Sequence, residues 1–283
     1  MKSTLFGTQL LCAAMVWALN VSASWAQTAP TGEVKGSAVS HTAASRPGVM
    51  ASAQVALPAS LTQSAVFVGK WRDMPSNLNG KVPVVVFLHG SSGLGLKAIE
   101  EWQRWLAEMG VASVAPDSFA LPDRLTYKSP VSKSVYEQIH ALRTSEIAVA
   151  LAALQSTPWV DMSRLALAGT SEGATSVARY TGNEFVARML YAWSCEDNYF
   201  VESHRTAIPA DQPFLNVISV VDPFFSSTNT WLDNTKPRGH CGDPARGYKK
   251  ATVVLLGDAP HTLLNLPAAR GATADFVRQT LKP

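Results

Sequence analysis

The feature that most constrains the fold is the run VPVVVFL at Val82–Leu88, which is almost continuously apolar. Strands that are buried on both faces have this pattern, and they occur mainly in parallel sheets covered by helices. Similar short apolar runs recur along the chain and are separated by longer segments. The further strand-like runs are Ala65–Val68, Val111–Ala115, Leu165–Ala168, Met189–Trp193, Phe214–Val221 and Thr252–Leu256.

The segments between these runs have the pattern of helices, with apolar residues repeating every three or four positions. The expected helices are Leu96–Met109, Lys133–Gln155, Ala174–Arg179 and Gly271–Leu281. Strands that alternate with helices predict an α/β fold with a mainly parallel sheet and helices on both of its faces. In such sheets, functional side chains gather in the loops that follow the carboxyl ends of the strands.

The N-terminal end has the pattern of an export signal followed by a flexible segment. Lys2 precedes an apolar stretch from Leu5 to Leu19, and Ser24-Trp25-Ala26 has the small residues of a cleavage site. The next stretch is rich in Ala, Ser, Thr, Pro and Gly and has few large apolar side chains, which predicts a flexible leader. The predicted divisions are a signal peptide at 1–26, a leader at 27–60 and a single α/β domain at 61–283.

Charge and hydropathy restrict the partners of this chain. The formal net charge is +3, with no basic run of the kind that follows a nucleic-acid backbone, so we expect no nucleic-acid partner. The N-terminal apolar stretch is interrupted and falls short of the ~20 residues that a membrane span needs. We therefore expect no stable membrane anchor and an exported protein, either periplasmic or secreted.

Two cysteines follow the predicted signal peptide, Cys195 and Cys241. In an exported protein an even pair of cysteines predicts a disulfide. The alternative is a metal site that also uses His240. However, adjacent His-Cys ligands lack the usual spacing of zinc sites. We therefore expect no metal, and no motif in the sequence calls for a cofactor.

The strand at Leu165–Ala168 leads into the pentad Gly169-Thr170-Ser171-Glu172-Gly173, and a helical pattern follows. A strand, a sharp turn and a helix form the context of a nucleophile elbow, in which glycines permit close backbone approach around an exposed serine. The helix amino terminus beneath Ser171 would favour a developing negative charge. The pentad predicts that Ser171 is a nucleophile; the alternative is an ordinary helix N-cap.

Two later strands end near residues that would complete a catalytic triad. Asp222 follows Phe214–Val221, and His261 follows Thr252–Leu256, which gives the order Ser, Asp, His along the chain. His261 is predicted to accept the hydroxyl proton of Ser171, and Asp222 is predicted to orient the imidazole. The alternatives are Glu196 and Asp197 as the acid and His240 as the base.

The loop His89-Gly90-Ser91-Ser92-Gly93 follows the buried strand Val82–Leu88. An acyl-transfer site stabilises its oxyanion with two backbone N–H groups, one after the nucleophile and one from a loop of this kind. We expect these to be the N–H groups of Glu172 and Ser91, with Ser92 as the alternative to Ser91. His89 is expected to brace the loop.

Together these motifs resemble the α/β-hydrolase superfamily over nearly the whole mature domain. Within it, the stretch Ala115-Pro116-Asp117-Ser118-Phe119 is similar to the dienelactone hydrolase-like family. In that family an arginine shortly after this stretch helps hold a substrate carboxylate, and the resemblance implies Arg124 as a possible substrate anchor. Dienelactone hydrolases proper have a cysteine where this pentad has Ser171, and their oxyanion loop differs from His89-Gly90-Ser91, so a dienelactone substrate is not implied.

These observations predict an exported serine hydrolase that cleaves carboxylic esters through an acyl-enzyme on Ser171, with a small-molecule or ester substrate. An acyltransferase or a peptidase on the same fold would use the same serine chemistry. A non-catalytic binding protein on a hydrolase scaffold is the alternative from another class, and its expected mark is a broken triad.

Overall fold

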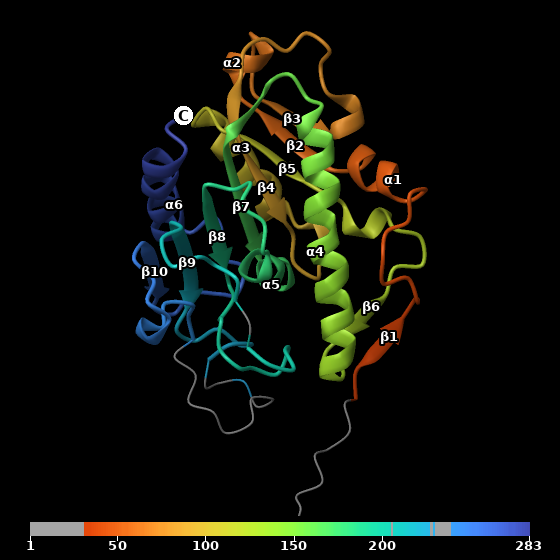
Figure 1. Cartoon of the computed structure of the whole chain (residues 1–283), viewed down its shortest axis with the longest axis vertical. Coiled ribbons are helices and arrows are strands. Elements are labelled where there is room, and N and C mark those ends of the chain that lie inside the picture. Colours follow the sequence, from red (N-terminus) through yellow and green to blue (C-terminus); the bar gives the residue numbers. More distant parts are fainter. Residues whose placement is uncertain (1–30, 205, 227–228, 230–238) are drawn as a thin grey trace, which may run out of the picture. The chain divides into compact units, whose positions relative to one another are not determined.

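The computed structural model describes residues 31–204, 206–226, 229 and 239–283. Its centre is an eight-stranded sheet of order β10-β9-β8-β7-β4-β5-β2-β3 (Figure 1). Neighbouring strands are parallel except around β2, which is antiparallel to both β5 and β3. The strands are β2 Gln54–Leu57, β3 Phe67–Lys70, β4 Val82–Leu88, β5 Ala112–Ala115, β7 Val160–Thr170, β8 Ala187–Tyr191, β9 Phe214–Ser219 and β10 Ala251–Leu256.

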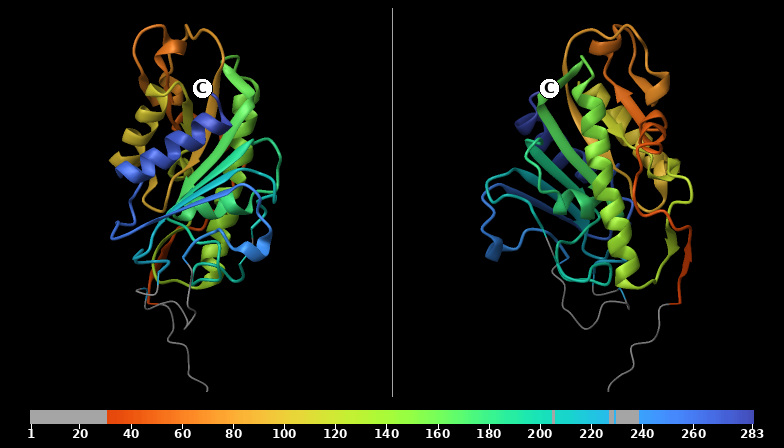
Figure 2. Two further views of the ribbon diagram at one scale, coloured as in Figure 1. Left: turned by 90° about the vertical axis from the view of Figure 1, so that its left-hand side faces the viewer. Right: turned by 45° about the vertical axis from the view of Figure 1, so that its right-hand side comes forward.

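Helices cover both faces of this sheet: α3 and α6 lie on one face, and α4 and α5 lie on the other (Figures 1 and 2). The helices are α1 Arg46–Ala51, α2 Ala59–Thr62, α3 Lys97–Glu108, α4 Lys133–Gln155, α5 Glu172–Arg179 and α6 Pro267–Thr280. Short 3₁₀ segments are Trp71–Asp73, Gly93–Gly95, Ser118–Ala120 and Pro244–Arg246. A separate antiparallel pair joins β1 Glu33–Lys35 to β6 Thr126–Lys128.

The buried strand β4 divides the core between the two faces. Val84 and Val86 pack into the cluster that includes residues of α4 and α5, whereas Val85 and Phe87 pack into the cluster that includes residues of α3 and α6. Successive side chains of a strand point to opposite faces, so a strand between two helical layers must be apolar throughout. This explains the unbroken apolar run that the sequence has at β4.

The predicted fold class, an α/β domain with a mainly parallel sheet, is confirmed. The bounds of β4 and α4 coincide with the expected Val82–Leu88 and Lys133–Gln155. Strand β7 is longer than the expected Leu165–Ala168 and begins at Val160, because its first residues pair with the start of β4 before the apolar run.

The predicted flexible leader is wrong for residues 31–60, which hold β1, α1, β2 and the start of α2. Strand β2 is buried along its whole length between β5 and β3, and the side chains of Val55 and Leu57 have no exposed area. The composition of the segment as a whole conceals these few apolar residues, which suffice for one internal strand. The domain therefore begins before residue 61; the predicted signal peptide at 1–26 lies outside the described residues.

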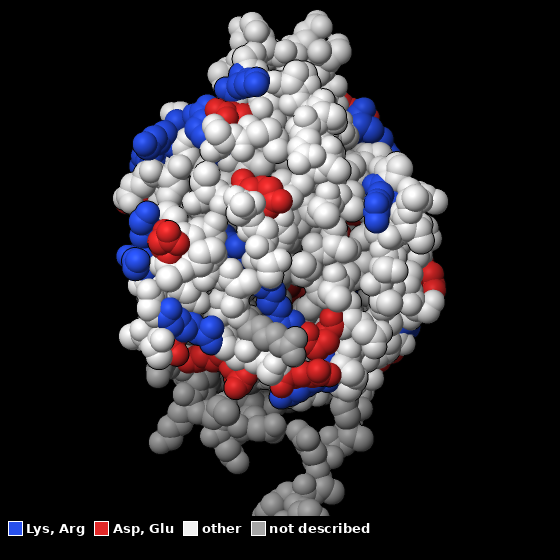
Figure 3. Space-filling model, viewed as in Figure 1, with Lys and Arg blue, Asp and Glu red and all other residues white. Residues whose placement is uncertain are grey.

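No helix in the described part of the chain has the length and hydropathy needed to cross a membrane. On the face seen in Figure 3, Lys and Arg side chains are scattered, and Asp and Glu side chains lie among them near the lower edge. This face carries no continuous basic band. The expected absence of nucleic-acid and membrane partners stays a prediction.

The role of β2 in the core gives a direct stability test. Replacing the fully buried Leu57 by alanine should lower the free energy of unfolding by about 2–5 kcal/mol, because it leaves a cavity in the core. Val34, which is 44% exposed in β1, is the matched control, and its replacement by alanine should change the value by less than about 0.5 kcal/mol. Urea unfolding of both variants measures the difference. Equal, negligible effects would mean that this segment is a leader after all.

Candidate active site

Ser171 lies on a strained turn between β7 and α5. Its backbone angles are φ 52° and ψ −122°, a conformation that residues with side chains rarely adopt. Two glycines make this turn possible: a Cβ at Gly169 would lie 2.8 Å from the backbone of Gly173, and a Cβ at Gly173 would lie 2.2 Å from the carbonyl oxygen of Leu88. The sequence therefore has glycine at both positions because no side chain fits there.

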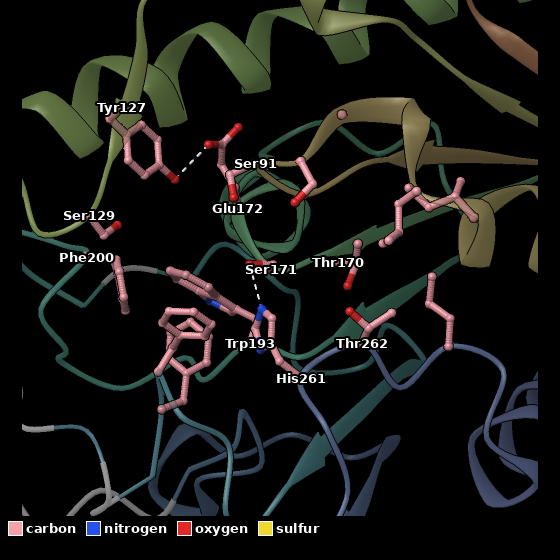
Figure 4. Close-up of a pocket in the computed structure, with 18 of the residues that line it drawn as sticks. Ser91, Tyr127, Ser129, Thr170, Ser171, Glu172, Trp193, Phe200, His261 and Thr262 are labelled. Carbon is pink, nitrogen blue, oxygen red and sulfur yellow. Dashed lines mark hydrogen bonds between the residues drawn. The ribbon is translucent and has the colours of Figure 1, made fainter. Parts of the chain in front are cut away.

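The structure brings together the three residues predicted as a triad. The Nε2 atom of His261 lies 3.0 Å from Oγ of Ser171, and its Nδ1 atom lies 2.7 Å from Oδ2 of Asp222 (Figure 4 shows the contact with Ser171). The carboxylate of Asp222 is fully buried, and its Oδ1 accepts a hydrogen bond from the backbone N–H of Phe224. With Nδ1–H donating to this carboxylate, Nε2 is left as the acceptor for the serine hydroxyl.

The alternative acids and base lie elsewhere. Glu196, Asp197 and His240 line a small depression beside the cysteines, separate from the cavity that Ser171 lines. Glu196 accepts a hydrogen bond from the backbone N–H of Gly239. The carboxylate in contact with the His261 imidazole is that of Asp222. The geometry therefore favours Asp222 as the acid and His261 as the base over these alternatives.

The two residues whose backbone N–H groups are predicted to bind the oxyanion lie at the same cavity as Ser171. Ser91 and Glu172 both line it, and so does Ser92. Among the described residues, no acceptor is hydrogen-bonded to the backbone N–H of Ser91 or Glu172. The loop that holds Ser91 comes close to the nucleophile, since a Cβ at Gly90 would lie 3.3 Å from Cβ of Ser171. Neither N–H group is taken up by a bond within the described residues, which is consistent with their predicted role.

His89 is the first residue of this loop and has no exposed area. Its Nδ1 atom donates to the carbonyl oxygen of Gly90 at 2.7 Å, while Nε2 accepts from the backbone N–H of Ser118 and from Nη1 of Arg143. Burial and the nearby Arg143 guanidinium hold the pKa of His89 well below its usual value, so the ring is neutral. These contacts fit the predicted role of a brace for the loop.

The carboxylate of Glu172 is buried and is held by two arginines and a tyrosine. Arg124 contacts Oε1 at 3.0 Å, Tyr127 donates its hydroxyl to Oε2 at 2.8 Å, and Nε of Arg143 lies 3.6 Å from Oε1. Arg143 also donates to the carbonyl oxygen of His89 at 2.8 Å. This cluster ties the residue after the nucleophile to the loop that carries Ser91.

The suggestion that Arg124 anchors substrate is wrong in this structure. The guanidinium is almost completely buried and does not line the cavity. Besides Glu172, it donates to Oγ of Ser118 and to the carbonyl oxygen of Leu125. With these bonds, the guanidinium of Arg124 is not free to bind a substrate. The family resemblance depended on the position of Arg124 in the sequence, and that position does not reveal that the guanidinium is bonded to Glu172.

The Glu172 cluster gives a second stability test. Glu172→Gln keeps the size of the side chain but removes the negative charge that pairs with the buried Arg124, whereas Arg143 keeps its pair with Glu146. Such losses cost about 3–5 kcal/mol of unfolding free energy. The control is Glu100→Gln, which removes an exposed pair with Arg104 and should cost no more than about 1 kcal/mol. Urea unfolding curves compare the two variants; similar small losses would show that the buried charge is not needed.

Cys195 and Cys241 form the predicted disulfide. Cys195 lies two residues beyond Trp193, which lines the cavity, and the backbone N–H of Cys241 donates to the Asn216 side chain on β9. The bond therefore fastens the segment that carries Trp193 to the sheet. It also joins the two sulfurs that the alternative metal site would have used. The described residues contain no group of three or more His, Cys, Asp or Glu side chains that could hold a metal ion.

Reducing this disulfide should destabilise the protein. The bond spans a sequence separation of 46 residues, for which the chain-entropy model gives about 4 kcal/mol. We expect a lower melting temperature after reduction, with the two free thiols verified by intact mass. The double variant Cys195→Ser/Cys241→Ser is the control, since reductant should not change its melting temperature. An unchanged melting temperature of the reduced native chain would contradict the prediction.

The cavity beside Ser171 has a volume of about 440 Å³. Its walls include residues for which the sequence offered no specific signal: Tyr127, His140, Trp193, Phe200, Phe224 and Phe225. Aromatic residues are common in cores, and only the fold brings these together around one space.

No protein-family model matches this chain, and no curated protein matches its sequence. Solved structures do match it. A dienelactone hydrolase-like promiscuous phosphotriesterase, P91, from metagenomic libraries has a TM-score of 0.52 at 19% identity, over 89% of this chain and 99% of its own. A cold-adapted esterase from an Arctic intertidal metagenomic library has a TM-score of 0.51 at 14% identity, over 81% of this chain and 95% of its own.

A third match is dipeptidyl peptidase 4 of Porphyromonas gingivalis, with a TM-score of 0.50 and 15% identity over 81% of this chain and 35% of that protein. Of these matches, the phosphotriesterase P91 is the one described as dienelactone hydrolase-like. This chain has the α/β-hydrolase fold. The resemblance inferred from its motifs is thereby confirmed at the level of the fold.

Proposed function

We propose that this protein is a serine hydrolase that cleaves carboxylic esters through a Ser171–His261–Asp222 triad. The observation that carries the proposal is the pair of hydrogen bonds that links Asp222 to His261 and His261 to Oγ of Ser171. Ser171 and His261 both line the cavity. The α/β-hydrolase fold, shared with a known esterase, supports it.

The proposed reaction follows from the positions of these groups. Nε2 of His261 accepts the hydroxyl proton of Ser171 as Oγ bonds to the ester carbonyl carbon. The carbonyl oxygen becomes negative and accepts hydrogen bonds from the backbone N–H groups of Ser91 and Glu172. The bond to the alcohol oxygen then breaks, and the alcohol leaves with the proton from His261. Water attacks the acyl-Ser171 ester by the same route and releases the acid.

Asp222 serves this reaction through the imidazole. Its buried carboxylate accepts the Nδ1–H of His261, fixes the tautomer and stabilises the imidazolium that forms during attack. The cluster around Glu172 holds the oxyanion groups in position before substrate arrives. Preorganised donors of this kind lose no energy to reorientation during the reaction.

We further propose that the protein is exported, with cleavage of the predicted signal peptide after Ala26. The disulfide between Cys195 and Cys241 supports this, because such bonds persist in oxidising compartments. Periplasmic and secreted destinations both satisfy the argument.

The test is covalent labelling with a fluorophosphonate probe, read by intact mass. The native protein should gain one adduct, and Ser171→Ala should gain none, because the adduct forms on the activated nucleophile. Ser92→Ala is the matched control, since Ser92 lines the same cavity and its side chain has no proposed role. It should label like the native protein.

Labelling that persists in Ser171→Ala would place the nucleophile elsewhere and refute the proposal. Product analysis with a p-nitrophenyl ester in water, with and without an added alcohol, then separates hydrolysis from acyl transfer. Release of the free acid in both conditions is the result expected for a hydrolase.

A further inference from the structure

The cavity beside Ser171 has two chemically different sides. Figure 4 shows Trp193 and Phe200 on one side of Ser171 and His261, with Thr170 and Thr262 on the other. The labelled residues on one side are aromatic, whereas those on the other are small, and the lining as a whole also includes the aliphatic residues Leu96, Ile99 and Leu264. A substrate in this cavity therefore meets a distinct surface on each side of the nucleophile.

The rings of the aromatic side pack against one another. Ring centroids lie 4.9 Å apart for Trp193 and Phe225, 5.4 Å for Phe200 and Phe225, and 4.6 Å for Phe224 and the imidazole of His261. Rings in mutual edge contact have little freedom to rearrange, so the wall is formed before a ligand binds. Flat aromatic groups pack well against such surfaces, in stacked or edge-to-face arrangements.

His140 of α4 also lines this cavity, and the proposed reaction does not use its ring. The residue is only 3% exposed. Its Nδ1 atom is buried and has no hydrogen-bond partner, and no bond to Nε2 is found among the described residues. The ring lies edge-on to Trp193, with centroids 6.0 Å apart. A buried polar group without a partner is costly, and such groups in native proteins normally have one.

The charge state of His140 limits the partner it can take. Burial, reinforced by the positive charge of Arg179, lowers the pKa of His140 to about 3, so its imidazole is neutral at physiological pH. A neutral imidazole has one N–H donor and one acceptor nitrogen, and it suits a hydroxyl group, which both donates and accepts. It does not attract a carboxylate.

The other charges around the cavity lead to the same conclusion. Among its described lining residues there is no lysine or arginine, and the Glu172 carboxylate is engaged by Arg124 and Tyr127. A substrate carboxylate would therefore lose its hydration without gaining a cation in exchange. An uncharged substrate avoids this cost.

From the aromatic wall and the unbonded buried imidazole, we propose that the site selects an uncharged ester bearing a hydroxylated aromatic ring, with the ring against Trp193 and Phe225 and the hydroxyl hydrogen-bonded to His140. This inference rests on the proposed ester hydrolase function. The ring can belong to the acid part or the alcohol part of the ester, and both present the same chemistry to the wall. His140 is then the residue that determines specificity.

The experiment uses pairs of esters that differ by one hydroxyl group. One pair has the ring in the acid, methyl 3-(4-hydroxyphenyl)propanoate and methyl 3-phenylpropanoate. The other has it in the alcohol, 2-(4-hydroxyphenyl)ethyl acetate and 2-phenylethyl acetate. In at least one pair, the hydroxylated ester should have a kcat/KM about tenfold or more above its partner, because the partner leaves His140 unpaired.

Variants assign the preference to His140. His140→Phe should abolish the difference within the pair while keeping an aromatic ring beside Trp193, and His140→Gln should retain part of it through its amide. His204→Phe is the matched control: the same substitution at a histidine that lines a different depression should leave the preference unchanged. Fluorophosphonate labelling verifies that each variant has an intact nucleophile.

Binding to Ser171→Ala, followed by tryptophan fluorescence, repeats the comparison without turnover. It separates failure of this inference from failure of the proposed function. Labelling of Ser171 together with equal kcat/KM and equal affinity in both pairs would overturn the inference alone. Absent labelling would overturn the hydrolase proposal, and a hydroxyl preference in binding that His140→Phe removes would still support the inference. A preference that survives in His140→Phe would overturn the role of His140.

Discussion

The site depends first on how closely the turn after β7 packs against the end of β4. A side chain at Gly173 would collide with the carbonyl oxygen of Leu88, so only glycine lets the turn pack there. Leu88 and Gly169 are register partners in neighbouring parallel strands, and both strands therefore end at the same edge of the sheet. This one contact brings Ser171, in its strained conformation, beside the loop that carries Ser91.

Ion pairs between buried side chains then hold the parts of the chain around Ser171 in position. Glu172 begins α5, Arg143 lies on α4, and Arg124 precedes β6, so their ion pairs join three separate parts of the chain around one carboxylate. Buried ion pairs contribute little net stability relative to apolar packing, but removing one member leaves uncompensated charge. The cluster therefore fixes the backbone of Glu172 relative to the loop that carries Ser91, as the proposed oxyanion role of their N–H groups would require.

The sequence predicted best what depends on chain order and on strand ends. Ser171, Asp222 and His261 each follow an apolar run, and a parallel sheet gathers such positions at one edge. It predicted poorly what depends on a partner distant in sequence. Nothing near Arg124 indicates that Glu172 will bind it, and nothing near Val55 and Leu57 indicates that β5 will later pair with them. His140 has the spacing of a core residue of α4, and only the fold opens a cavity beside it.

The antiparallel strand β2 has a consequence for how the fold forms. Its pairing with β3 joins neighbouring parts of the chain, with Leu57 opposite Phe67, whereas its pairing with β5 needs residues as distant as Ala115. Closing a short loop costs less conformational entropy than closing a long one, and local contacts form sooner. The β2–β3 pair is thus a unit that can assemble first and dock onto β5 afterwards. Folding of the sheet can therefore begin at the end of the sheet that β3 forms.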